Sequence, residues 1–136
     1  MTDILILLLL ITASIWDFKK REVPIFCQVA LMLFLPFVYV NGNVWGTLIA
    51  LPFFISACIT EGMGGGDWKM IGLLGLCFGF VKTFQVTVIG CIIFVISGYI
   101  MQKCKGKEKV FFPFVPALTA GYIIELILEV YRHWIR

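Results

Sequence analysis

The segment Gly62-Met63-Gly64-Gly65-Gly66-Asp67-Trp68-Lys69 separates two long apolar runs of this chain. It places four glycines just upstream of a carboxylate, and it places that carboxylate at the start of an apolar segment. An ionisable residue at the end of a membrane helix is costly to bury, so it is a functional-site hypothesis. The simpler interpretation is a flexible loop with a solvated aspartate. Asp17 favours the functional interpretation, because it lies in a similar position at the end of the first apolar run.

The composition predicts a membrane protein. Hydrophobic residues make up 61% of the 136 residues, and the mean hydropathy of +1.02 is far above that of a soluble globular domain. Charged residues make up 14% and are clustered between the apolar runs. We therefore expect an all-α polytopic protein with one membrane-embedded domain over residues 1–136. The net charge of +3 does not indicate a nucleic-acid partner.

Six transmembrane helices account for the apolar runs. Because a spanning helix needs about 20 apolar residues, we expect spans around the apolar runs 1–16, 24–40, 44–60, 70–81, 83–102 and 110–134. The fourth apolar run, 70–81, would cover only about 18 Å of a hydrocarbon core about 30 Å thick. Its helix is therefore expected to begin near Asp67. The first run lacks a basic start and a small-residue cleavage site, so we expect a retained span rather than a signal peptide.

The basic residues predict the orientation of these spans. Eight of the eleven lie in the connections between spans one and two, three and four, and five and six. The positive-inside rule makes that side cytoplasmic, so both termini would lie outside the inner (cytoplasmic) membrane. Asp17 and Asp67 would then both lie at cytoplasmic helix ends, although the spans were assigned without reference to them.

Two carboxylates in one site can hydrolyse a peptide bond. Their mutual repulsion keeps one protonated while the other is ionised. The ionised group takes a proton from water and the protonated one polarises the carbonyl, so no metal or cofactor is expected. If Asp17 and Asp67 form such a site, the cytoplasmic ends of the first and fourth spans should pack together. Their carboxylates should approach to on the order of 3–7 Å.

The same residues resemble a known family. Gly64-Gly65-Gly66-Asp67 reads GxGD, Lys69 extends it to GxGDxK, and Asp17 is followed by Arg21 and by Val23-Pro24. Together with the six-span layout, these segments resemble the type IV prepilin peptidases, which are polytopic aspartic peptidases of the membrane.

The resemblance implies an endopeptidase that removes the short basic leader of prepilin-like proteins at the cytoplasmic face, in type IV pilus assembly and protein secretion. It implies that Asp17 and Asp67 are catalytic and that Gly64, Gly66 and Lys69 shape the site. We expect the two glycines to be required by positive φ angles and close backbone approach.

Two departures from the family pattern affect what is expected. Val23-Pro24-Ile25 stands where the family often has Ile-Pro-Asn, so any polar role of that Asn is missing. Only a short connection separates Asp17 from Pro24. The chain therefore resembles the short members that lack a cytoplasmic domain with paired cysteines, and methyltransferase activity is not expected.

Other interpretations remain open. Asp17 and Asp67 would equally serve a small proton- or cation-coupled transporter or channel subunit, although this gives no reason for the glycines. Lys69 is as well explained as a positive anchor at the membrane surface. Glu125 and Glu129 are better explained as a surface pair than as a proton path. The five cysteines form no CxxC pair, so a zinc site or disulfide framework is not expected.

Overall fold

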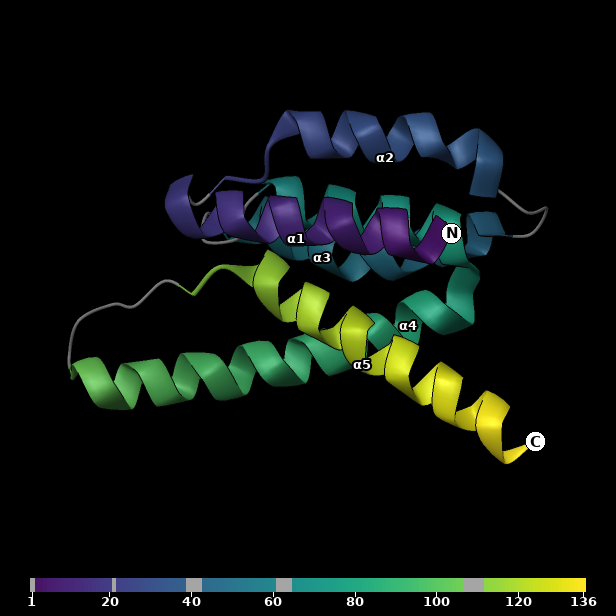
Figure 1. Cartoon of the computed structure of the whole chain (residues 1–136). Coiled ribbons are helices and arrows are strands. Elements are labelled where there is room, and N and C mark those ends of the chain that lie inside the picture. Colours follow the sequence, from purple (N-terminus) through teal and green to yellow (C-terminus); the bar gives the residue numbers. More distant parts are fainter. Residues whose placement is uncertain (1, 21, 39–42, 61–64, 107–111) are drawn as a thin grey trace.

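The computed structural model of the chain describes residues 2–20, 22–38, 43–60, 65–106 and 112–136, and this part of the chain contains helices and no strand (Figure 1). The elements are α1 (Thr2–Lys20), α2 (Ile25–Val38), the 3₁₀ helix η1 (Asn43–Ile49), α3 (Ala50–Ile59), α4 (Gly65–Lys105) and α5 (Phe114–Ile135). The all-α prediction is confirmed.

The long helix α4 reverses its direction at Gly79. This residue has φ 79° and ψ −179°, a backbone conformation that glycine adopts readily because it has no Cβ. The hydroxyl of Thr83 donates a hydrogen bond to the Leu74 carbonyl across the bend, at 3.1 Å. The two arms, residues 65–78 and 80–105, run in opposite directions (Figure 1). They correspond to the expected fourth and fifth spans, with the boundary three residues earlier than Lys82.

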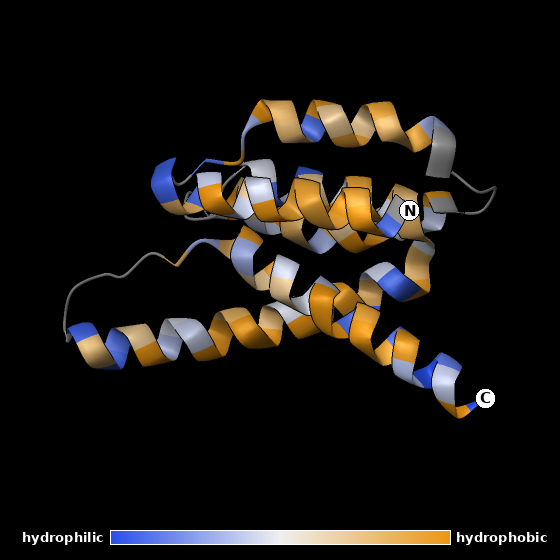
Figure 2. Cartoon of the chain, viewed as in Figure 1, coloured by the Kyte–Doolittle hydropathy of each residue, from blue (hydrophilic) through white to orange (hydrophobic). Residues whose placement is uncertain are grey.

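The helical segments coincide with the expected apolar spans. α4 and α5 are long and apolar enough to cross a membrane, whereas the apolar stretches of α2 and of η1 with α3 are shorter. Hydrophilic residues gather at the two ends of the bundle, and apolar residues fill the region between them (Figure 2). That all six segments span the bilayer remains a prediction.

Glycines allow the helices to cross closely. A Cβ added to Gly121 on α5 would lie 2.7 Å from the Val86 carbonyl oxygen of α4. A Cβ added to Gly46 on η1 would lie 2.9 Å from the Cα of Gly75 on α4. Such contacts are typical of membrane helices, whose association depends on close packing because lipid is as apolar as the side chains.

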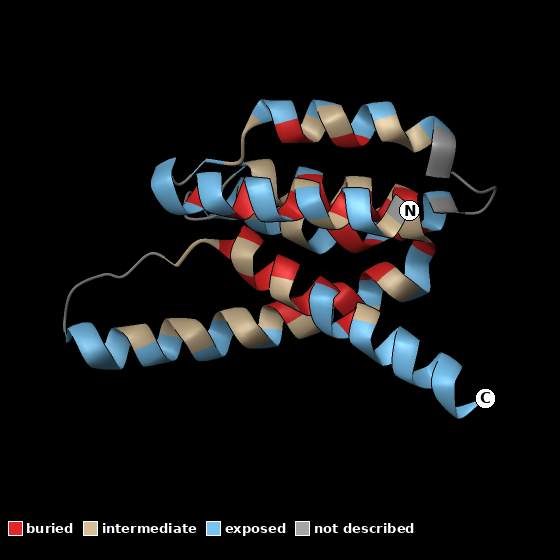
Figure 3. Ribbon diagram, viewed as in Figure 1, coloured by how far each residue is buried: buried red, intermediate tan, exposed pale blue. Residues whose placement is uncertain are grey.

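The buried residues line the middle of the bundle, and its outer faces are exposed and apolar (Figure 3). Leu10, Leu31 and Met70 have no exposed surface, whereas Leu33 on α2 is 70% exposed and Val95 on α4 is 66% exposed. A soluble monomer rarely exposes so much apolar surface, so these faces suit a lipid environment.

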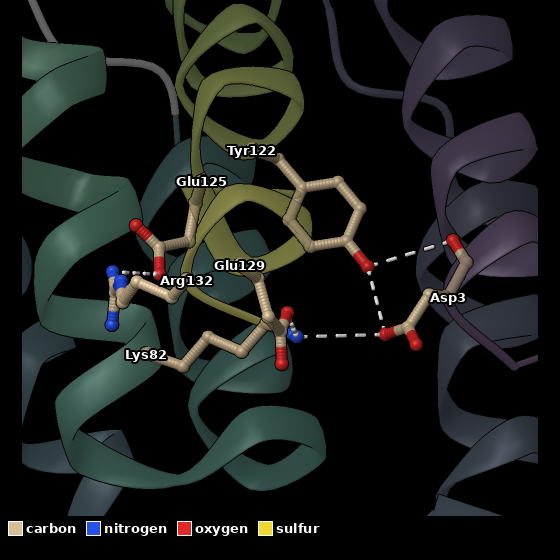
Figure 4. A network of polar contacts seen from close by, with 6 residues as sticks. All are labelled: Asp3, Lys82, Tyr122, Glu125, Glu129 and Arg132. Carbon is tan, nitrogen blue, oxygen red and sulfur yellow. Dashed lines mark hydrogen bonds and ion pairs between the residues drawn. The ribbon is translucent and has the colours of Figure 1, made fainter. Parts of the chain in front are cut away.

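A polar network joins three helices at the end of the bundle where α1 begins (Figure 4). The Lys82 ammonium lies 2.8 Å from a Glu129 carboxylate oxygen and 3.7 Å from one of Asp3. The Tyr122 hydroxyl donates to the same Asp3 oxygen at 3.1 Å.

The expectation of a surface pair at Glu125 and Glu129 is wrong for one of its members. Glu129 is exposed, but Glu125 is buried and accepts a hydrogen bond from Arg132 at 3.1 Å. The position of Glu125 on the inner face of α5 explains the difference, because its neighbours Gly121 and Tyr122 are also buried there.

Candidate active site

Asp17 lies near the end of α1 and is held at the beginning of α5. Its side chain is buried, with 5% exposure for the residue. One carboxylate oxygen accepts a hydrogen bond from the backbone N–H of Val115 at 3.4 Å. Val115 is in the first turn of α5, where backbone N–H groups have no partner within the helix and favour a negative charge.

Asp67 lies in the first turn of α4 and is half-buried. The charge of Asp17 is one of the electrostatic influences on the Asp67 carboxylate, which indicates that the two side chains lie in the same region. The two residues come from helices far apart in the chain and lie at the same end of the bundle. The sequence prediction that both lie at one end is consistent with this arrangement.

The sequence predicted that the first and fourth spans pack directly together. This prediction is wrong for their backbones, because the described residues of α1 and α4 are not in backbone contact. α1 packs against α2 and α5, and α4 packs against α2, η1, α3 and α5. The two aspartates are therefore brought together by elements that touch both helices, namely α2 and α5.

Gly66 provides the close approach that the sequence predicted. A Cβ added to it would lie 2.6 Å from the Cβ of Val23 and 3.2 Å from the side-chain nitrogen of Gln28. Val23 belongs to the short connection between α1 and α2. This contact therefore holds the beginning of α4 beside the C-terminal end of α1. An added Cβ on the neighbouring Gly65 would meet nothing within 4 Å. Gly64 lies outside the described residues.

The second reason expected for these glycines does not apply to Gly66. Within the described part of the chain, positive φ angles occur at Gly79 and Gly106. Gly66 is already inside α4, and a helical residue has negative φ. Gly72, in contrast, has room: an added Cβ would lie 3.6 Å from that of Ala50, an ordinary contact.

Lys69 is exposed and forms no ion pair with a described carboxylate. Its ammonium lies 5.7 Å from the centre of the Trp68 ring. Both residues border an apolar groove of about 610 Å³ between α2, η1, α3 and α4, which is also lined by Gln28, Met32, Leu51 and Phe54. Asp67 itself does not line this groove, although the next two residues of α4 do.

Aromatic rings surround the first turn of α5. The Phe18 and Phe112 ring centres are 6.1 Å apart, and Phe94 lies 5.5 Å from Phe114, which in turn lies 6.0 Å from Phe53. These contacts tie the beginning of α5 to α1, α3 and α4. They hold in place the helix end that binds Asp17.

The sequence analysis missed a buried polar pair beside Asp17. The Ser14 and Thr119 hydroxyl oxygens are 2.6 Å apart, and both residues are buried. Ser14 lies three residues before Asp17, so both are on one face of α1. That spacing inside an apolar run was the signal in the sequence. The partner on α5 could not be identified without the fold.

The described cysteines are all free, and no described group of three or more His, Cys, Asp or Glu side chains could hold a metal ion. No residues are therefore assigned to a metal.

These features define the class: an all-helical membrane protein whose two conspicuous carboxylates meet at one end of its bundle. The sequence model of the type IV leader peptidase family matches residues 4–99, more than half of the chain. The chain belongs to that family, and it is thus a peptidase with prepilin-like substrates in general. The resemblance found in the sequence is confirmed. Searches of curated proteins and of solved structures gave no match.

Proposed function

We propose that this protein is an aspartic endopeptidase that removes the short basic leader of prepilin-like proteins, with Asp17 and Asp67 as its catalytic pair. The observation that carries the proposal is the proximity of these two carboxylates in a member of a leader peptidase family. Both lie near helix ends, Asp17 in the last turn of α1 and Asp67 in the first turn of α4.

Asp17 is the ionised member of the pair. Neighbouring carboxylates do not both ionise readily, and the Val115 N–H group favours the charge on Asp17. Asp67 lies in the first turn of its own helix, and no hydrogen bond from a described residue reaches its carboxylate.

The reaction then needs only one water molecule. Asp17 takes a proton from the water molecule while the oxygen of that water bonds to the carbonyl carbon of the substrate. Asp67 gives its proton to the carbonyl oxygen. When the C–N bond of the resulting diol breaks, Asp17 passes its proton to the leaving nitrogen. The diol returns a proton to Asp67, so both carboxyl groups end as they began.

The active site faces the cytoplasm in this proposal, and both termini lie outside the inner membrane. The basic residues support this orientation, because Lys19 and Lys20 end α1 on the side of Asp17. A substrate could keep its basic leader in the cytoplasm while its apolar helix remains in the bilayer.

Cleavage by the purified protein tests the proposal. In detergent, without any ion gradient, it should cleave a prepilin that has a basic leader, a glycine before the cut and an apolar segment after it. Mass spectrometry of both products would identify the bond. Failure to cleave, together with proton or cation flux in reconstituted vesicles, would favour the transporter instead.

A further inference from the structure

A buried pair of hydroxyls lies one helical turn from the Asp17–Val115 contact. Ser14 is 9% exposed and Thr119 is 6% exposed, and their hydroxyl oxygens are 2.6 Å apart. Ser14 precedes Asp17 by three residues and Thr119 follows Val115 by four. The two cross-helix contacts are therefore separated by about 5 Å along the boundary of α1 with α5.

Both hydroxyls also contact backbone carbonyls. Ser14 can donate to the Leu10 oxygen at 2.7 Å, and Thr119 can donate to the Val115 oxygen at 2.9 Å or to the Leu10 oxygen at 3.3 Å. Each hydroxyl has a single proton, but every arrangement leaves both oxygens with a partner. Thr119 thus touches the same residue, Val115, whose N–H group holds Asp17.

Apart from the contact of Tyr122 with Asp3 at the far end of the two helices, the rest of the boundary between α1 and α5 is apolar. Leu10, Ala13 and Leu118 are fully or almost fully buried and apolar. Apolar contacts in a bilayer are weakly specific because lipid tails offer the same surroundings. The Asp17–Val115 distance of 3.4 Å exceeds the usual 2.7–3.2 Å range, so that bond is weak. The contact between the Ser14 and Thr119 hydroxyls, at 2.6 Å, is the shorter of the two contacts between α1 and α5 near Asp17.

We propose that Ser14 and Thr119 are positioning residues for Asp17: their buried contact sets the rotation and height of α1 on α5, and so places the Asp17 carboxylate at the Val115 N–H group and opposite Asp67. This role rests on the proposed function. The positioned atom is a catalytic one, and a misplacement of about 1 Å can lower a rate about 100-fold.

Thr119→Val tests the proposal, because it removes the hydroxyl and keeps the shape of the side chain. We expect kcat for leader cleavage to fall roughly 10–100-fold while KM changes less than about two-fold. Thr119→Ser restores the hydroxyl and should recover most of the activity. Thr87→Val is the matched control: Thr87 is 4% exposed, and its hydroxyl has no partner among the described residues. It should leave kcat within about two-fold.

A second measurement does not depend on cleavage. In protein labelled with ¹⁵N-valine, the Val115 amide signal, assigned through its loss in Val115→Ile, reports the hydrogen bond to Asp17. It should shift in Asp17→Asn and in Thr119→Val, and stay in place in Thr87→Val. If Thr119→Val does not reach the membrane, Ser14→Ala replaces it in both measurements.

The outcomes separate this proposal from the proposed function. A shifted amide signal in protein that cleaves no leader would support the positioning geometry and end the peptidase assignment. Normal cleavage with equal behaviour of Thr119→Val and Thr87→Val would overturn the positioning role and leave the peptidase assignment standing. Equal impairment in Thr119→Ser and Thr119→Val would also overturn it, because the restored hydroxyl would then not matter.

Discussion

Asp17 and Asp67 approach one another from opposite kinds of helix end. Asp17 lies near the C-terminal end of α1, where the helix dipole disfavours a carboxylate, and the beginning of α5 offsets this. Asp67 lies at the N-terminal end of α4 and follows a glycine-rich stretch of sequence. Asp17 therefore lies at the end of a neighbouring helix, whereas Asp67 lies at the end of its own helix.

Asp17→Asn and Asp67→Asn should each lower kcat for leader cleavage by roughly 10²–10⁴-fold, because an amide can neither ionise nor donate the required proton. Membrane expression should be unchanged. Glu22→Gln is the control, since Glu22 is an exposed carboxylate just beyond the same end of α1. Near-normal turnover in either aspartate variant would refute the catalytic pair.

Cleavage should also resist EDTA, serine- and thiol-directed reagents, and the change His133→Ala. A pair of carboxylates activates water without a metal or a covalent intermediate. His133, the single histidine of the chain, lies in the last turn of α5, at the other end of that helix from Val115. Measured rates within about two-fold of the untreated protein are expected, and loss of activity under any of these conditions would contradict the mechanism.

The sequence was sufficient to propose the two aspartates as the site but not to identify the residues that surround them. Asp17 and Asp67 stand out because each interrupts an otherwise apolar pattern at a helix end. Val23, Val115 and Thr119 carry no such signal, since an apolar residue or a threonine is ordinary in a membrane helix. Their importance comes from which helices meet, and the local pattern contains no information about that.

At the scale of the elements, the beginning of α4 is held beside the C-terminal end of α1 by a contact that leaves no space for a side chain at Gly66. Val23 presses on Gly66 at the beginning of α4, whereas Gly65 faces open space. The sequence predicted the need for glycine here, but it gave positive φ as one reason, and the helix in fact begins one residue earlier than Gly66. Close packing alone accounts for the glycine.

Gly66→Ala should therefore impair the enzyme more than Gly65→Ala. The added methyl group must push Val23 away, at a cost of about 1–3 kcal/mol in the free energy of unfolding, and kcat should fall roughly 10–100-fold as the aspartates separate. Gly65→Ala should be neutral or slightly stabilising, because alanine favours a helix. Thermal unfolding in detergent and leader cleavage would be measured on both.

A second substitution checks the cause of that loss. Val23→Gly removes the Cβ that lies 2.6 Å from the position of the new methyl group. Combined with Gly66→Ala, it should restore part of the activity, giving a favourable coupling in a double-mutant cycle. Purely additive losses would show that the two residues act independently and would contradict the packing argument.

At the scale of the whole molecule, the two ends of the bundle have different tasks. One end holds the aspartates and the basic residues Lys19 and Lys20. The other holds the ion pairs of Lys82, which connect α1, α4 and α5 (Figure 4). The sequence predicted where the helical segments lie along the chain, because the lengths of the apolar runs and the charges between them define those segments. It did not predict this network, whose members are far apart in the chain.

Lys82→Met should lower stability without lowering the rate of cleavage. It leaves Asp3 and Glu129 without their shared cation, but both carboxylates are about half exposed, so the loss should be about 1 kcal/mol. The melting temperature in detergent should fall by roughly 3 °C. Lys103→Met, which removes an exposed lysine from the last turns of α4, should not change it. A lower kcat in Lys82→Met would show that the two ends are coupled.

The reversal at Gly79 has a consequence for how the protein is made. The first arm of α4, residues 65–78, is only about 21 Å long, too short to cross a core of about 30 Å as an independent segment. It can enter the bilayer stably only as a hairpin with the second arm, once the ribosome has released that arm. The hydrogen bond to Asp17 forms later still, because its donor, Val115, is synthesised after both arms. Under the proposed function, the two aspartates would therefore begin to hydrolyse a leader only when the chain is almost complete.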